Sequence, residues 1–386
     1  MKIALVTSEF PPMSAAAASR VGPWADVLEE RGHEVKVLSS RQATSEDSRV
    51  QASRFEAPSV RANLPRRLLQ EIRLGRDIGQ LLRCLDPQPE LTIITSPPFF
   101  MACLCARTLR HLNLPYVFDV RDRYPAVLFD LGLLSPKGFI GKFLKRMEGK
   151  VYAGARLVST VTQGLTKDLG EVAGKDKVAW FPNGFDGKVF GKKASFQSKD
   201  EPFTVFYHGR LGRFYDVEAL RALILETERL DSNVRFRLAG DLGAVSRNGD
   251  WGRTEFLGET SLPCIADFLA ESSLGICILK DSEAMRKAFP AKVYEYLGAG
   301  LPVLVAPTGE LTDFVSERKA GMVFSQADPH AMAQAIVELK ADPTAWNRMS
   351  DNAWALRSSL DRRDGANRFA EQLERICETS VKRKLN

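Results

Sequence analysis

One short stretch of the chain places a lysine and a glutamate where they could hold a phosphorylated ligand. Residues 288–307 (AFPAKVYEYLGAGLPVLVAP) predict a helix that begins at Pro290, a glycine turn, and a buried strand. The N-terminus of such a helix presents free backbone N–H groups and the positive end of the helix dipole. Phe289, Ala291 and Lys292 flank this end, and Lys292 adds a full positive charge. These features together favour the binding of a phosphate group.

Glu295 follows Lys292 by three residues, so the two side chains share one face of the predicted helix. A carboxylate one turn behind a phosphate site is well placed to accept hydrogen bonds from the hydroxyl groups of a ribose. The alternative is an ordinary capped helix between two strands, in which Lys292 and Glu295 form a solvated ion pair.

A second candidate anion site follows a predicted strand near residue 208. Two guanidinium groups, those of Arg210 and Arg213, stand there beside Gly209 and Gly212. A guanidinium can bind two phosphate oxygens at once, and glycine keeps the neighbouring backbone small. The spacing does not match the G-x-G-x-x-G fingerprint of dinucleotide-binding proteins. The alternative is a surface turn with exposed arginines.

The elements around these residues predict an α/β protein with two doubly wound domains. A strand, a loop, a helix and a second strand follow one another within the first 40 residues, and the same order returns after residue 202. With 386 residues the chain is too long for a single core. Ligands of such sheets bind outside the carboxyl ends of the strands, which places residues 8–20 at a binding site. Within them, Ser19 and Arg20 are candidate contacts of an acceptor or a diphosphate, although Arg20 could equally be a solvated helix arginine.

A charged cluster ends a later predicted strand. It consists of Asp119, Arg121, Asp122 and Arg123. All four cannot be solvated if the strand is central, so some should face the binding site. The alternative is that Arg121 and Asp122 pair with each other and fix the loop.

Composition excludes several classes of protein. No run of eighteen apolar residues appears, and the chain starts directly with a strand, so we expect a cytoplasmic protein without a signal peptide or a spanning helix. Six scattered cysteines without C-x-x-C spacing, accompanied by only four histidines, argue for buried thiols and against a metal site.

The positive charge is concentrated in the first half. Residues 1–195 hold 29 basic and 20 acidic residues, whereas the remainder holds 25 and 28. No nucleic-acid-binding motif accompanies the excess, so an anionic membrane surface or an anionic substrate is preferred. Residues 60–84 interleave leucines with arginines on a predicted amphipathic helix, which suits an anionic bilayer. The arginines that would contact lipid are Arg61, Arg66, Arg67, Arg73 and Arg76. A helix packed through its leucines, with the arginines in water, is the alternative.

Four motifs together resemble the family-4 retaining glycosyltransferases of GT-B fold. They are P-x-K-x-x-E-Y-x-x-x-G-x-P-V from Pro290, V-R-D-x-x-P from Val120, A-x-x-V-x-x-V-T-x-G from Ala155 and F-P-N-G-F-D from Phe181. The subgroup that the chain most resembles builds bacterial O-antigen, capsule and exopolysaccharide chains and includes L-fucosamine transferases.

The resemblance implies two facing Rossmann-like domains. We expect an acceptor-side domain over 1–190, a linker over 191–202, a nucleotide-sugar domain over 203–365, and a helix over 366–386 that returns to the first domain.

The resemblance also assigns roles to residues. It implies that Arg210, Arg213 and Lys292 hold the donor diphosphate, that Glu295 holds the ribose, and that the turn at Leu257 contacts the base. Asp122 would lie near the reacting sugar, which makes Asp122, Arg213 and Lys292 the expected catalytic residues. No metal and no cofactor is expected, because the nucleotide sugar is a substrate.

The expected reaction is transfer of a hexosyl group from a nucleotide diphosphate, for which UDP is preferred, to a hydroxyl of a lipid-linked glycan, with retention. The protein would then work on lipopolysaccharide or exopolysaccharide as a cytoplasmic enzyme, peripheral on the inner face of the membrane. A GT-B sugar-nucleotide epimerase and a non-catalytic nucleotide-sugar-binding subunit are the alternatives.

The chain departs from the family pattern at two places. Lys287 stands where many members have a first glutamate, and alanines occupy 15–18 where paired glycines are usual.

Overall fold

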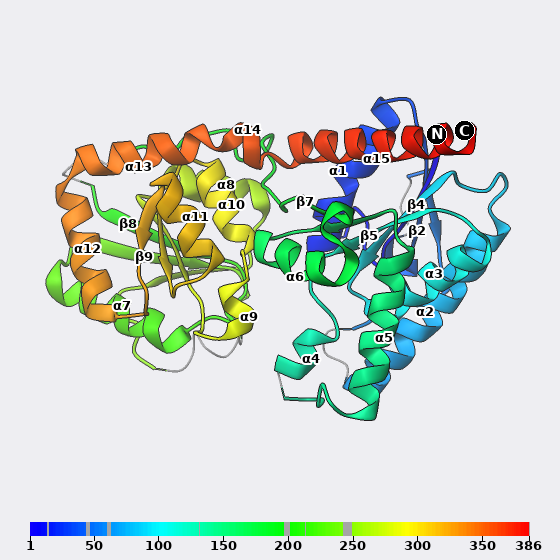
Figure 1. The fold of residues 1–386 in the computed structure, drawn as a ribbon. Helices are drawn as coiled ribbons and strands as arrows, with labels where there is room; N and C mark the ends of the chain where they lie inside the picture. The colour runs from blue at the N-terminus through cyan, green and yellow to red at the C-terminus, as the bar shows by residue number, and fades with distance from the viewer. Residues whose placement is uncertain are drawn as a thin grey trace. The chain divides into compact units, whose positions relative to one another are not determined.

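The computed structural model describes residues 1–13, 15–43, 47–59, 63–130, 132–196, 201–212, 214–241 and 249–385. Internal contacts divide the chain into two compact units. The first unit comprises Met1–Pro182 together with Gly365–Asn386, and the second comprises Asn183–Asp364. Each unit is an α/β structure built on its own sheet (Figure 1).

The first unit contains a seven-stranded parallel sheet in the order β3-β2-β1-β4-β5-β6-β7. Its strands are β1 (Lys2–Val6), β2 (Glu34–Ser39), β3 (Val50–Ala52), β4 (Leu91–Ser96), β5 (Tyr116–Val120), β6 (Leu157–Thr160) and β7 (Val178–Trp180). Its helices are α1 (Ala16–Glu30), α2 (Leu64–Cys84), α3 (Phe99–His111), α4 (Ala126–Asp130), α5 (Phe139–Gly154) and α6 (Gln163–Ala173), with short 3-10 turns at Arg41–Ala43 and Lys175–Lys177.

The second unit contains a six-stranded parallel sheet in the order β10-β9-β8-β11-β12-β13. Its strands are β8 (Phe203–His208), β9 (Val234–Ala239), β10 (Glu255–Gly258), β11 (Leu274–Ile278), β12 (Val303–Ala306) and β13 (Gly321–Val323). Its helices are α7 (Val217–Leu230), α8 (Leu262–Ala270), α9 (Glu283–Arg286), α10 (Ala291–Gly298), α11 (Glu310–Arg318), α12 (Pro329–Ala341), α13 (Pro343–Ala355) and α14 (Arg357–Leu360).

Burial on both faces explains the apolar strands of the first sheet. Along β1, Ala4 and Val6 point into a core that includes residues of α2, α3, α5 and α6, whereas Ile3 and Leu5 point into a core with α1 and the last helix. Successive side chains of a strand point to opposite faces, so a strand covered on both sides reads as continuously hydrophobic. The two predicted α/β domains with parallel sheets are confirmed.

The glycines of α2 do not interrupt it. The helix runs unbroken from Leu64 to Cys84, although Gly75 and Gly79 lower the intrinsic preference for one continuous helix. A Cβ atom on Gly75 would lie 2.8 Å from the Cα atom of Met101 in α3, and one on Gly79 would lie 2.9 Å from Thr108 Oγ1. The glycines therefore permit close packing of α2 on α3, and this packing stabilises the helix.

The contacts place the division between the units after Pro182, earlier than residue 190. Phe185 and Phe190 belong to the core of the second unit. The expected linker of 191–202 is also partly structured, because the buried Ala194 donates its backbone N–H to the Ala299 carbonyl oxygen at 2.7 Å. Sequence polarity in this stretch concealed the few apolar side chains that attach it to the second unit.

The last helix, α15 (Arg362–Leu385), packs with the first unit from Gly365 onward. Phe369 is fully buried and stacks on Trp24 of α1, with 4.0 Å between the ring centroids. The end of the chain thereby covers one face of the first sheet.

Candidate functional site

The carboxyl edge of the second sheet is lined by glycine. Gly209 and Gly240 directly follow β8 and β9, and Gly258 ends β10; their φ angles are 98°, 114° and 69°. A Cβ atom on Gly240 would lie 2.6 Å from the carbonyl oxygen of Gly209. Only glycine fits such positive φ angles and so close an approach without strain. The edge therefore exposes bare backbone where parallel α/β sheets bind their ligands.

Helix α10 carries the predicted lysine to a position beneath this edge. Pro290 is the N-cap and Ala291 the first helical residue, close to the predicted start. Lys292 is buried, and a Cβ atom on Gly209 would lie 3.5 Å from its Nζ atom.

The ammonium group of Lys292 lies against aromatic rings. Its Nζ atom is 3.5 Å from the ring centroid of Tyr207 and 4.1 Å from that of Tyr215. It makes no hydrogen bond within the described part of the chain. Burial lowers the pKa of Lys292 to about 7. Cys277 and Glu295 act to raise this pKa, but their effects are smaller than that of burial. A buried cation without a hydrogen-bond acceptor is costly, which suggests that an anionic ligand supplies the missing partner.

Glu295 lies one turn further along α10 and is also buried. Its Oε2 atom is 3.1 Å from Nε2 of His208, in a contact too poorly aligned for a good hydrogen bond. The backbone N–H of His208 donates to the hydroxyl of Tyr296 at 3.2 Å. The structure therefore adds His208 to the site. Sequence analysis missed it, although a histidine directly before the glycine that ends a strand was a usable signal.

The remaining donor-side predictions have different surroundings. Arg210 is exposed and pairs with Asp241, with 3.3 Å between Nε and Oδ2. Leu257 is half-buried on β10, beside the exposed Phe256. Phe289 stacks on Tyr294 in the core, with ring centroids 4.2 Å apart, so its side chain serves packing and only its backbone is near the start of α10. Arg213 lies outside the described residues.

Arg20 in the first unit is a structural arginine, which corrects its interpretation as an anion anchor. Its Nε and Nη2 atoms donate to the two carboxylate oxygens of Asp119 at 3.1 and 2.9 Å. Its Nη1 atom donates to the carbonyl oxygen of Phe181 at 2.8 Å, and both charged residues are buried. Asp119 also accepts a hydrogen bond from Ser159. The guanidinium is therefore already occupied by the protein.

The other acceptor-side residues lie at the end of β5 and on α1. Arg121 donates from Nη2 to the Pro97 carbonyl oxygen at 2.9 Å, and burial lowers its pKa. Asp122 is exposed, and Ser19 is half-buried. Of the two predicted carboxylates at this strand end, Asp122 faces solvent and Asp119 is buried. Within the described residues, Arg121 and Asp122 do not form an ion pair.

The arginines of α2 are divided between solvent and neighbouring side chains. Arg66, Arg73 and Arg76 are exposed, whereas Arg67 pairs with Glu71 at 3.3 Å. Arg61 lies outside the described residues.

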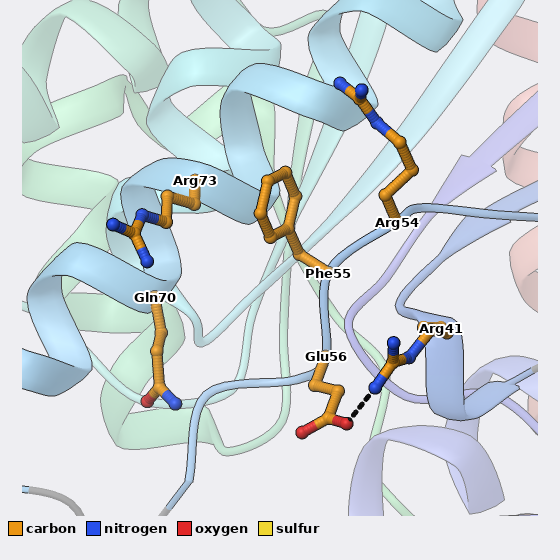
Figure 2. Close-up of a pocket in the computed structure, with 6 residues that line it drawn as sticks. All are labelled: Arg41, Arg54, Phe55, Glu56, Gln70 and Arg73. Carbon is orange, nitrogen blue, oxygen red and sulfur yellow. Dashed lines mark hydrogen bonds and ion pairs between the residues drawn. The ribbon is translucent and has the colours of Figure 1, made fainter.

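Arg73 and Gln70 of α2 line a pocket of about 330 Å³ near the carboxyl ends of β2 and β3. In Figure 2 both lie on the helix to one side and the segment that carries Phe55 and Glu56 lies on the other, with an ion pair between Glu56 and Arg41. Arg54, at the rim, pairs with Asp77 at 2.7 Å. The pocket thus gathers three guanidinium groups, of which two pair with carboxylates.

No group of three histidine, cysteine, aspartate or glutamate side chains close enough to hold a metal ion occurs in the described ranges. Of the helices that the structure describes, none combines the length and the apolar character needed to cross a membrane.

Two family models match the chain side by side. The model described as "Glycosyl transferase 4-like domain" matches residues 16–184, and the model described as "Glycosyl transferases group 1" matches residues 202–342. No curated protein sequence matches the chain.

Solved structures of low sequence identity share the fold. A sucrose-phosphate synthase from Thermosynechococcus elongatus is 14% identical, with a TM-score of 0.73 and coverage of 98% of this chain and 99% of its own. The HepE protein of Anabaena in complex with UDP-glucose is 19% identical, with a TM-score of 0.67 and coverage of 97% and 99%. WaaG, a glycosyltransferase involved in lipopolysaccharide biosynthesis, is 13% identical, with a TM-score of 0.63 and coverage of 96% and 98%.

Proposed function

We propose that this chain, as a glycosyltransferase of GT-B fold, transfers a hexosyl group from a UDP-sugar. The acceptor would be a hydroxyl of a lipid-linked glycan, and the reaction would proceed with retention. The product would be part of a bacterial surface polysaccharide, such as lipopolysaccharide or an exopolysaccharide. The UDP complex of HepE and the lipopolysaccharide role of WaaG, both relatives in fold, support these two choices.

The observation that carries the proposal is the arrangement of Lys292 and Glu295 beneath the glycine-lined edge. Lys292 is a buried cation within 3.5 Å of the position that a side chain on Gly209 would occupy. A diphosphate resting on the bare backbone would give its ammonium group the acceptor that it lacks. Glu295, one turn deeper, would accept hydrogen bonds from the ribose hydroxyls.

The chemistry needs stabilisation of negative charge. The bond between the anomeric carbon and the diphosphate breaks with its electron pair on the phosphate oxygen, while the acceptor oxygen forms the new bond and passes its proton to an oxygen of the departing diphosphate. Lys292, Arg210 and Arg213, together with the N–H groups at the start of α10, would neutralise the charge that develops on the diphosphate. A metal ion has no part in this scheme, and exclusion of water would limit hydrolysis of the donor.

The acceptor would bind at the first unit. Asp122 is the exposed carboxylate at the carboxyl end of β5, so it is our proposed catalytic group on this side, and Ser19 and Arg121 are further proposed acceptor contacts. The proposal assigns Arg20 no contact with either substrate, because Asp119 and the Phe181 carbonyl occupy it.

The alternatives of an epimerase and a non-catalytic binding subunit are not favoured, because both matched models describe transferases. Incubation of the purified protein with UDP-sugars and lipid-linked glycans tests the proposal through UDP release and a glycan enlarged by one sugar. We expect activity in wild type and in Lys188→Met, an exposed control, and loss of at least about tenfold in Lys292→Met. Isomerised sugar nucleotide without glycan extension would contradict the proposal.

A further inference from the structure

The start of α5 exposes an unusual group of large apolar side chains. Phe139 is 88% exposed, and Leu133, Ile140 and Phe143 are each more than half exposed. Phe139 and Phe143 are one helical turn apart, so they share a face. Contiguous apolar exposure of this kind marks a surface that contacts something other than water.

The opposite face of α5 holds the helix in the first unit. Leu144 and Val151 are buried in its core. A Cβ atom on Gly141 would lie 2.2 Å from the carbonyl oxygen of Ser135, so the preceding loop crosses closely over the first turn. Fixed packing beneath therefore presents Phe139 and Phe143 outward, and they cannot turn inward without disrupting the core.

Positive charge surrounds the apolar group. Lys137, Lys142, Lys145, Arg146 and Lys150 are all exposed. The only acidic residue in the stretch 132–150 is Glu148, which is buried and lies 3.3 Å from Arg123 Nε. Aromatic and aliphatic side chains beside exposed lysines suit an anionic lipid surface, because the rings enter the acyl boundary while the lysines bind headgroups.

The topology places this group at the carboxyl edge of the first sheet. Helix α5 follows β5 and ends immediately before β6. Its first turn therefore lies at the edge where β5 ends, which is also the edge of Asp122. In Figure 1 the loop after α4 and the first turn of α5 form the lower rim of the first unit.

We propose that this surface, defined as the α5 patch, docks the protein on an anionic bilayer. The α5 patch comprises Leu133, Lys137, Phe139, Ile140, Lys142, Phe143, Lys145 and Arg146. Docking through it would bring the end of β5 close to the bilayer, where a lipid-linked acceptor is anchored; this consequence rests on the proposed function, whereas the docking itself does not.

The membrane contact expected on α2 stays a prediction beside the α5 patch, because only part of the apolar surface of α2 is buried. The leucine and isoleucine residues Leu74, Ile78 and Leu82 of α2 are buried in the core and cannot enter a bilayer. Leu64 and Leu69 near the start of α2 are each 47% exposed beside exposed arginines, so α2 can add to a membrane contact, but the most exposed large apolar side chain that the structure describes, Phe139, is on α5.

Sedimentation of the full chain with vesicles tests the proposal. One set of vesicles contains phosphatidylglycerol, and the other consists of phosphatidylcholine alone. We expect wild type to bind the anionic vesicles, and both Phe139→Ser/Phe143→Ser and Lys142→Glu/Lys145→Glu to bind at least about tenfold more weakly. The control Arg83→Glu/Lys175→Glu makes the same charge change at exposed sites next to the amino ends of strands and should bind like wild type.

The outcomes separate the α5 patch from the catalytic proposal. Wild type that ignores anionic vesicles, or a Phe139→Ser/Phe143→Ser variant that binds them normally, overturns the docking proposal. A wild-type dimer that this variant converts to a monomer also overturns it, because the α5 patch would then be an interface between copies. The variants should keep the wild-type rise in melting temperature with UDP, so failure of UDP to bind would refute the donor site and leave the docking result intact.

Discussion

At the scale of single residues, the central feature is a buried lysine to which the described residues offer no hydrogen-bond acceptor. Lys292 is held between two tyrosine rings, and this environment lowers its pKa to about 7. An anionic ligand would offset this cost, since burial penalises the charged form of a lysine until a counter-charge arrives.

The first prediction concerns the pH dependence of stability. The pKa of Lys292 is about 7 in the folded chain and near 10.5 in the unfolded chain, so the unfolded state binds one more proton between these values. The free energy of unfolding therefore rises with pH over this window. Lys292→Met lacks this titration and does not bury a charge, so it should be more stable than wild type at about pH 7. This difference in the free energy of unfolding should shrink by a few kcal/mol by about pH 10. Denaturant unfolding of both proteins across the window checks this, and a difference independent of pH would contradict it.

The second prediction tests the corrected interpretation of Arg20. Asp119→Asn leaves a buried guanidinium without its counter-charge and should destabilise the protein by about 3–5 kcal/mol. Glu34→Gln, which removes one partner of an exposed pair, should cost less than about 1 kcal/mol. Denaturation midpoints measure both effects. Unchanged stability of Asp119→Asn would show that Arg20 does not act as a structural residue.

The sequence was sufficient to pair Lys292 with Glu295, because a spacing of three residues on one short helix places both side chains on the same face. Arg20 is different. Whether it contacts a ligand or a buried carboxylate depends on Asp119, which is 99 positions away and reaches it only through the order of strands in the sheet. Local patterns carry no information on such a pairing.

At the scale of elements, glycine positions decide how the helices pack. Gly75 of α2 abuts the backbone of α3, whereas Gly149 of α5 has open space around it. The same residue type therefore has opposite effects in two helices of one unit.

The third prediction follows from this contrast. Gly75→Ala should destabilise the protein by about 1–3 kcal/mol, because the added methyl group would overlap the Met101 backbone. Gly149→Ala should raise stability by up to about 1 kcal/mol through helix propensity alone. Thermal unfolding of the two variants provides the test. Equal effects would mean that the α2–α3 contact is looser than the structure shows.

Helices and strands with strong periodicity, such as those on either side of the glycine turn at 298–300, were predictable. The helix over residues 60–84 was also predicted, but its close packing on α3 through Gly75 and Gly79 was not, because that contact depends on a neighbouring helix. The α5 patch was not predicted, because the sequence of a basic helix with several phenylalanines does not show which of its faces packs against the core.

At the scale of the whole molecule, the sequence predicted two parallel α/β units and the resemblance predicted their GT-B class. The resemblance also implied a last helix that returns to the first domain, whereas the strand order and the contact of Phe369 with Trp24 required the structure, because both are long-range relations. The two matched family models together cover most of the chain. The proposed function depends most on the claim that the second unit binds the nucleotide sugar.

Calorimetric titration of the protein with UDP and UDP-glucose tests that claim most directly. We predict that wild type binds both and that Glu283→Ala, a change at an exposed glutamate of α9, binds equally well. Lys292→Met and Glu295→Ala should each weaken binding at least about tenfold, since each removes a hydrogen bond that involves a charged group. Wild-type affinity in both variants would contradict the proposed donor site.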